Sequence, residues 1–168
     1  SKLRGNSIGF VFQQFHLIPH LTALGNVSTA LLYRELTKPE IRQRSLAALE
    51  MVGLGGRYDH RPIEMSGGEQ QRVAIARALV TDPLMILADE PTGALDTKTA
   101  TIVMEIFKNL QSENRAIVLV THDLEIAEQM DRVVSMRDGK IVADDLRSER
   151  TDALEDRFWE AGKDGKLE

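Results

Sequence analysis

The chain has 168 residues, of which 42% are hydrophobic and 28% charged, a composition typical of one soluble globular domain. Asp and Glu outnumber Lys and Arg by 26 to 21, and the resulting formal charge of −5 argues against a protein whose main task is to bind nucleic acid. Cysteine is absent, which excludes disulfides and thiolate metal sites, and no apolar run reaches the ~18 residues of a membrane span.

Short apolar runs predict the strands. Four of them lie at residues 8–12, 84–88, 117–120 and 133–136. Because these runs are continuously apolar, they predict strands of a parallel sheet that is buried on both faces. A fifth run at 141–143 follows Asp138-Gly139, a pair that predicts a hairpin turn, so we expect the last two strands to be antiparallel.

Helices are expected between these strands. The expected helices cover residues 22–34 with Thr22 as cap, 38–52 with Thr37 as cap, a segment after Ser66, 96–111 with Asp96 as cap, and 124–130 with Asp123 as cap. This order predicts an α/β fold with a helical insert at about residues 22–65. Residues 66–145 complete the core, and 146–168 form a charged tail with one further helix expected at 151–161.

The segment Met65-Ser66-Gly67-Gly68-Glu69 begins the central helix. Ser66 and Glu69 have the spacing of a capping box. Two glycines in a first helical turn each cost about 0.8–1 kcal/mol relative to alanine. A helix N-terminus attracts anions, and glycine allows a close approach to the backbone. The segment therefore indicates either a phosphate contact or only a well-capped helix.

Polar side chains follow three of the predicted strands. Asp89 and Glu90 end one strand, His122 follows another, and Gln13 follows the first. Ligands of open α/β sheets bind at the carboxyl ends of the strands, so we expect these residues on one edge of the sheet. The alternatives are solvated acids at a turn and a structural histidine.

In chain order, these motifs resemble those of the nucleotide-binding ATPase subunit of ABC transporters, over about residues 8–145. Residues 65–69 resemble the signature Leu-Ser-Gly-Gly-Gln, with Met for Leu and Glu for Gln. Residues 12–19 and 88–96 look most like the lipoprotein-releasing and macrolide-exporter branch. The resemblance implies a P-loop NTPase-like, mostly parallel sheet with a helical insert and a C-terminal β-hairpin.

The resemblance also assigns catalytic roles. It implies that Asp89 is the Walker B aspartate that holds Mg²⁺, and that Glu90 is the catalytic glutamate that polarises the attacking water. Gln13 corresponds to the Q-loop glutamine, which contacts the Mg²⁺ site and senses the membrane subunit. His122 corresponds to the switch histidine, which contacts the γ-phosphate.

Further assignments concern partners. In the family, ATP lies between two subunits, so Ser66 to Glu69 would contact ATP held by a second copy or another ATPase subunit. Asp96 would lie at that dimer interface. The resemblance also implies membrane-spanning transporter subunits as partners, no nucleic acid, and a cytoplasmic position at the inner face of the membrane. Phe15, Leu17, Ile18 and Pro19 either receive a helix of such a subunit or pack inside the helical insert.

One element of the family pattern does not occur in the 168 residues. No Gly-x-x-x-x-Gly-Lys-[Ser/Thr] loop precedes Gln13. We expect residues 1–168 to form a single, incomplete ABC ATPase domain that lacks this P-loop and its N-terminal strand. By resemblance, the missing strand lies beside the strand that ends near Thr121. Alone, the chain is expected neither to bind ATP tightly nor to hydrolyse it, because the loop supplies most phosphate contacts and one Mg²⁺ ligand.

Two other interpretations stay open. The chain is either a catalytically inert dimerisation or interaction fragment that retains the signature helix, or a non-transport ABC ATPase. The second is disfavoured because such proteins usually carry long coiled-coil or linker insertions, and the sequence contains none.

Overall fold

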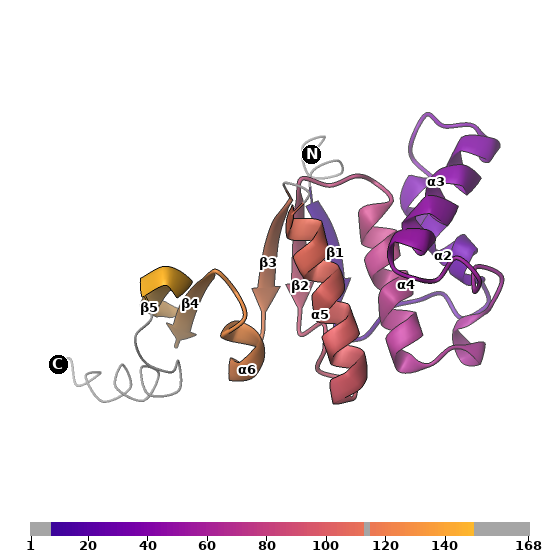
Figure 1. Cartoon of the computed structure of the whole chain (residues 1–168). Coiled ribbons are helices and arrows are strands. Elements are labelled where there is room, and N and C mark those ends of the chain that lie inside the picture. Colours follow the sequence, from indigo (N-terminus) through magenta and orange to yellow (C-terminus); the bar gives the residue numbers. More distant parts are fainter. Residues whose placement is uncertain (1–7, 113–114, 150–168) are drawn as a thin grey trace. The chain divides into compact units, whose positions relative to one another are not determined.

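The computed structural model describes residues 8–112 and 115–149 (Figure 1). The chain divides into two compact units, one up to Val120 and one from Thr121 onward. The helix expected at 151–161 lies outside the described residues. Within them, no helix combines the length and the apolar character that crossing a membrane requires.

The first unit contains a parallel sheet in the order β1-β2-β3. Its strands are β1 (Ile8–Phe12), β2 (Met85–Asp89) and β3 (Ala116–Val120). Phe12 pairs with Asp89, and Asp89 pairs with Val120, so the three strands end at the same level. Three of the four predicted parallel strands and their pairing are confirmed, with boundaries shifted by at most one residue. The prediction is wrong for the fourth run, 133–136, which does not pair with this sheet and lies in a separate antiparallel hairpin.

The prediction that both faces of this sheet are buried is wrong for the described residues. Gly9, Val11, Ile86 and Ala88 are buried on one face. On the other face, Phe10, Phe12, Val118 and Val120 are between 40% and 52% exposed.

The connections between the strands explain this one-sided burial. Helix α4 (Gly67–Leu79) packs against β1, helix α5 (Thr97–Ser112) packs against β3, and the two helices contact each other (Figure 1). Right-handed crossovers between strands in sequential order place both helices on one face. The described residues thus supply a covering layer to that face alone.

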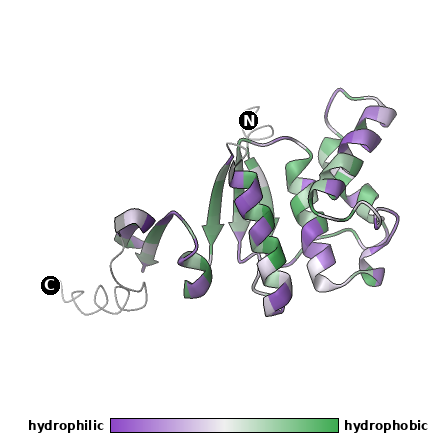
Figure 2. Ribbon diagram, in the orientation of Figure 1, coloured by the Kyte–Doolittle hydropathy of each residue, from purple (hydrophilic) through white to green (hydrophobic). Residues whose placement is uncertain are grey.

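Helix α5 has the amphipathic pattern that the sequence predicts. Val103, Phe107 and Leu110 are buried, and Ile106 is half-buried. Figure 2 shows hydrophobic and hydrophilic residues alternating along this helix, whereas β3 is largely hydrophobic. The buried stripe provides most of the driving force for packing α5 on the sheet, at about 25 cal/mol per Å² of apolar surface removed from water.

The expected helical insert lies between β1 and α4. It contains α2 (Ala23–Ser28), a 3-10 turn (Thr29–Leu31), α3 (Lys38–Met51) and a second 3-10 turn (Pro62–Glu64). Both α2 and α3 contact α4. Thr22 accepts a hydrogen bond from the Gly25 N–H (3.1 Å), and Thr37 forms a capping box with Glu40, so both predicted caps are confirmed.

Helix α2 is shorter than the predicted 22–34. The Ser28 hydroxyl donates to the Leu24 carbonyl (2.7 Å), and the Thr29 hydroxyl donates to the Asn26 carbonyl (2.6 Å). Such side-chain bonds compete with the regular backbone ladder, and the chain continues as a 3-10 turn to Leu31.

The second unit contains α6 (Leu124–Ala127) and a hairpin of β4 (Arg132–Arg137) and β5 (Lys140–Leu146). The strands are antiparallel, as predicted, and both Asp138 and Gly139 have positive φ, as a type I′ turn requires. Asp123 caps α6 through the Glu125 and Ile126 N–H groups. The helix is shorter than the predicted 124–130, and β5 extends into the region expected to be a tail.

We predict that Gly9→Ala lowers the free energy of unfolding by about 1–3 kcal/mol, as overpacking of a core does. An added Cβ would come within 2.9 Å of the Ala78 carbonyl and 3.2 Å of Pro83 Cγ, so β1 and α4 would have to separate. Urea denaturation measures the change. Gly56→Ala is the control, because nothing lies within 4 Å of its added Cβ. Equal stability of the two variants would contradict the prediction.

Candidate functional site

Gln13 and Glu90 lie next to each other at the carboxyl edge of the sheet. Each follows the last residue of its strand, and the register places these last residues side by side. A Cβ added to Gly93 would come 2.8 Å from Gln13 Nε2 and 3.6 Å from Glu90 Cβ, so the Gln13 amide and the start of the Glu90 side chain both lie beside this glycine. Two residues selected separately from the sequence are thus neighbours in the structure.

The backbone holds Glu90 in an unusual conformation. Its φ is +45°, in the left-handed region that a residue other than glycine adopts at a cost. The Glu90 N–H donates to the Val120 carbonyl (2.9 Å), and the Glu90 carbonyl accepts from the Gly93 N–H (3.2 Å). Glu90 directly follows β2, and these two bonds fix the direction in which its half-buried side chain leaves the backbone.

Asp89 and Gln13 are the residues on this edge that fit Mg²⁺. Both are exposed, and they offer a carboxylate and an amide oxygen. Mg²⁺ is usually bound by one or two carboxylates together with phosphate oxygens and water. No cluster of three or more His, Cys, Asp or Glu side chains suited to a metal occurs in the described ranges. The pair therefore suits a Mg²⁺ ion that arrives with a nucleotide.

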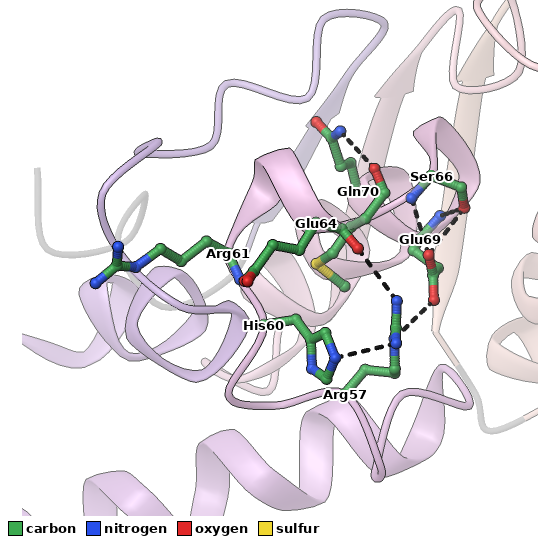
Figure 3. Close-up of polar contacts among 8 residues, drawn as sticks. Arg57, His60, Arg61, Glu64, Ser66, Glu69 and Gln70 are labelled. Carbon is green, nitrogen blue, oxygen red and sulfur yellow. Dashed lines mark hydrogen bonds and ion pairs between the residues drawn. The ribbon is translucent and has the colours of Figure 1, made fainter.

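The N-terminus of α4 has the predicted capping box, and a basic side chain supports it (Figure 3). Ser66 Oγ accepts from the Glu69 N–H (3.3 Å), and Glu69 Oε2 accepts from the Ser66 N–H (2.9 Å). Arg57 Nε lies 3.1 Å from Glu69 Oε1, and the same guanidinium contacts His60 Nε2 and the Glu64 carbonyl. The hydrogen bond from the Ser66 N–H is the main cause that lowers the pKa of Glu69, with Arg57 contributing less.

The two glycines of this segment differ in their surroundings. Gly68 is buried, and a Cβ there would overlap the methyl carbon of Thr99 on α5. Gly67 is half-buried, and a Cβ there would make only ordinary contacts of 3.8 Å with Leu95 and Phe15. Packing within the chain therefore explains the glycine at 68. It does not explain the glycine at 67.

Asp96 caps α5, as predicted. Its Oδ1 accepts from the Thr99 N–H (3.1 Å), and its Oδ2 accepts from the Thr99 hydroxyl (2.7 Å). The hydrogen bond from the Thr99 hydroxyl is the main cause that lowers the pKa of Asp96. Since Thr99 also packs against Gly68, this threonine joins the expected dimer-interface aspartate to the start of the signature helix.

The segment that follows Gln13 is fastened to the helices. Arg77 donates to the carbonyls of Phe15 (2.9 Å) and His16 (2.6 Å). The buried Asn26 accepts from the Ile18 N–H (2.6 Å) and donates to the Ile18 carbonyl (3.1 Å). Phe15, Leu17 and Ile18 are half-buried, and Pro19 is exposed.

His122 belongs to the second unit, in the turn between β3 and α6. The N–H of the next residue, Asp123, donates to Thr121 Oγ1 (3.0 Å). The proposed γ-phosphate contact of His122 stays a prediction.

Four residues that contact the predicted site residues or their chain neighbours were not singled out from the sequence. They are Arg57, Gln71, Gly93 and Thr99. Gln71 left a usable signal, because Gly68, Gln71, Ile75 and Ala78 form one buried helical stripe in which it is the only polar side chain. The others act through contacts between segments distant in the sequence, which spacing does not reveal.

The model of the family described as "ABC transporter" matches residues 1–93, just over half of the chain. The chain belongs to the ABC transporter family. The lipoprotein-releasing system ATP-binding protein LolD of Pseudomonas fluorescens is 51% identical over 143 residues, covering 84% of this chain and 63% of that protein. The macrolide export ATP-binding/permease protein MacB of Chlorobium phaeobacteroides is 52% identical over 147 residues, covering 88% of this chain and 22% of that protein.

These relatives confirm the expected likeness to the lipoprotein-releasing and macrolide-exporter branch. Among solved structures, the dimeric post-hydrolysis state of the ATP-binding cassette MJ0796 with ADP and Pi is 45% identical, with a TM-score of 0.76 over 87% of this chain and 65% of that one. The expected α/β fold of an ABC cassette is thereby confirmed. The chain spans about three-fifths of the length of the first curated relatives, at 63%, 61% and 60%.

We predict that Gly68→Ala lowers the free energy of unfolding by about 1–3 kcal/mol, because Thr99 has to move. Gly67→Ala should leave it unchanged or raise it by up to about 1 kcal/mol, since alanine favours helix. Thermal or urea denaturation separates the two variants. Thr99→Ser removes the overlapping methyl group, so Gly68→Ala should cost less in that background. Additive effects at 68 and 99 would count against the contact.

We also predict that Glu69 stabilises the protein near neutral pH and not in acid. A carboxylate whose pKa is lowered in the folded state stabilises it above the ordinary pKa of about 4.3, and this contribution disappears as the pH falls through the lowered value. The difference in unfolding free energy between wild type and Glu69→Gln should therefore shrink from pH 7 to about pH 3. Glu105→Gln, on the exposed side of α5, is the control. A difference that stays constant over this range would refute the assignment.

Proposed function

We propose that the chain is part of the ATP-binding subunit of an ABC transporter, which couples ATP hydrolysis to transport across a membrane. The observation that carries this proposal is that Gln13, Asp89 and Glu90 lie at the carboxyl edge of a parallel sheet, where the Gln13 amide and the Glu90 Cβ are both beside Gly93. The names of the two relatives, an ATP-binding/permease protein and an ATP-binding protein, support it. A lone glutamate on a loop would not support this proposal.

Each residue of this edge has a part that its placement suits. Glu90, fixed by backbone bonds on both sides, orients a water molecule and accepts its proton. Asp89 and Gln13 offer oxygens to Mg²⁺, which neutralises charge on the phosphates when it is bound. For His122, which belongs to the second unit, the family resemblance alone implies a contact to the terminal phosphate.

A second subunit completes the proposed site. Ser66, Gly67 and Gly68 present a helix N-terminus to a nucleotide held by another copy or another ATPase subunit. Asp96, which caps α5 near this point, lies at the interface between the two. The dimeric state named for the MJ0796 cassette supports this arrangement. Membrane-spanning subunits are the further partners, and the assembly lies at the inner face of the membrane.

A catalytically inert dimerisation fragment is the second candidate. The absence of a Gly-x-x-x-x-Gly-Lys-[Ser/Thr] motif from these 168 residues favours it for the isolated chain. In that case the chain would retain only the half-site at Ser66 to Gly68 and would serve a partner that holds ATP.

We predict no Mg²⁺-dependent ATP turnover by the isolated chain. The same chain extended at its N-terminus by a Gly-x-x-x-x-Gly-Lys-Ser loop, with its strand and helix, should hydrolyse ATP. In this form, Glu90→Gln should reduce kcat about 10²-fold or more, as loss of a general base does. The rate of phosphate release measures the turnover of both proteins, and Glu105→Gln, which makes the same change of charge at an exposed position of α5, is the control. Turnover that does not depend on Glu90 would eliminate the proposed mechanism.

A further inference from the structure

A single buried amide connects α4 to the loops that follow β1 and β2. Gln71 is fully buried and lies one and a half turns into α4. Its Nε2 donates to the Pro91 carbonyl at 2.7 Å and makes a longer contact of 3.5 Å with the Phe12 carbonyl. These acceptors are 79 residues apart along the chain but meet at one side chain.

The two acceptors flank the residues of the proposed site. Phe12 directly precedes Gln13, and Pro91 directly follows Glu90. A hydrogen bond to a carbonyl fixes the plane of the peptide that this carbonyl belongs to. The Phe12 carbonyl shares its plane with the Gln13 nitrogen, and the Pro91 carbonyl shares its plane with the Thr92 nitrogen, in the turn that follows Glu90. The Gln71 amide thereby holds both loops close to Gly93, beside which the Gln13 amide and the Glu90 Cβ lie.

The energetics of this amide indicate a role beyond packing. Gln71 Oε1 is buried and has no hydrogen-bond partner among the described residues. A buried acceptor without a donor reduces stability, and an apolar residue of similar size would avoid this cost. A polar residue in an otherwise apolar stripe is typical of positions that serve function at the expense of stability.

The left-handed backbone of Glu90 needs such support. A residue in a sparsely populated conformation persists only when its surroundings determine it from several directions. The Val120 carbonyl and the Gly93 N–H fix Glu90 itself, and Gln71 fixes the residue after it.

We propose that Gln71 is a positioning residue, which sets the placement of Gln13 and Glu90 from the signature helix. This inference rests on the proposed function, because it gives Gln71 a part in ATP hydrolysis. A helix moves as a rigid element, so a displacement of α4 at Ser66 carries the Gln71 amide and both loops with it. The half-site for a partner's nucleotide and the hydrolytic edge of the same chain are thereby mechanically connected.

Gln70 provides a matched control. It lies on the same helix, and its Nε2 also donates to two backbone carbonyls, those of Pro62 (3.0 Å) and Met65 (3.1 Å). Both acceptors belong to the end of the helical insert, which covers about residues 22–65. Gln70→Met and Gln71→Met therefore remove the same chemical group and differ in the loops that they release.

The first experiment is amide hydrogen exchange on the 168-residue chain. Gln71→Met should accelerate exchange in residues 13–17 and 90–95 about fivefold, the factor that corresponds to one lost hydrogen bond. Gln70→Met should leave these segments unchanged. Gln71→Asn, which keeps the amide but shortens its reach, replaces Gln71→Met if that variant does not fold. Unchanged exchange in the two loops, or equal acceleration across the whole sheet, would overturn the proposal.

The second experiment measures ATP turnover of the loop-extended form. Gln71→Met should lower kcat about tenfold while KM for ATP changes less than about twofold, because positioning acts on the transition state. Gln70→Met should alter neither constant. A wild-type kcat in Gln71→Met would overturn the inference. If the wild-type form itself hydrolyses no ATP, the proposed function fails, and hydrogen exchange alone decides the role of Gln71.

Discussion

The register of the three parallel strands, which aligns their carboxyl ends, is the constraint on which the rest of the site depends. Phe12, Asp89 and Val120 lie in one row of the sheet, so the chain leaves β1 and β2 at the same height. A shift by one residue would turn every side chain to the opposite face and move Gln13 away from Glu90. The backbone bond from Glu90 to the Val120 carbonyl uses the third strand end in the same row.

Helix α4 links this row to the other half of the site. Its N-terminus has the capping box that Arg57 supports. Gly68 packs against Thr99, and Gln71 donates to the loops that follow β1 and β2. Thr99 in turn holds Asp96. The start of α4, the cap of α5 and the carboxyl edge of the sheet are therefore connected through side chains of one helix and its neighbour.

Local patterns determined what the sequence could predict. The continuous apolar run at 8–12 and the Asp138-Gly139 pair fixed a strand and a turn, because both depend on a few adjacent residues. One-sided burial of the sheet could not be predicted, since it depends on which face the connecting helices cover. The early end of α2 depends on hydroxyl groups that compete for backbone carbonyls. Contacts such as Gln71 with Pro91 join distant segments and have no sequence period.

The positive φ of Glu90 has a consequence for how variants at this position are interpreted. Glycine adopts this conformation without the penalty of about 1–3 kcal/mol that other residues incur. Glu90→Gly would therefore relax the loop while it removes the carboxylate, whereas Glu90→Gln retains the strained backbone and changes the charge alone. Under the proposed role of Glu90, position 90 exchanges stability for chemistry, and Glu90→Gly would give a more stable protein that lacks the carboxylate.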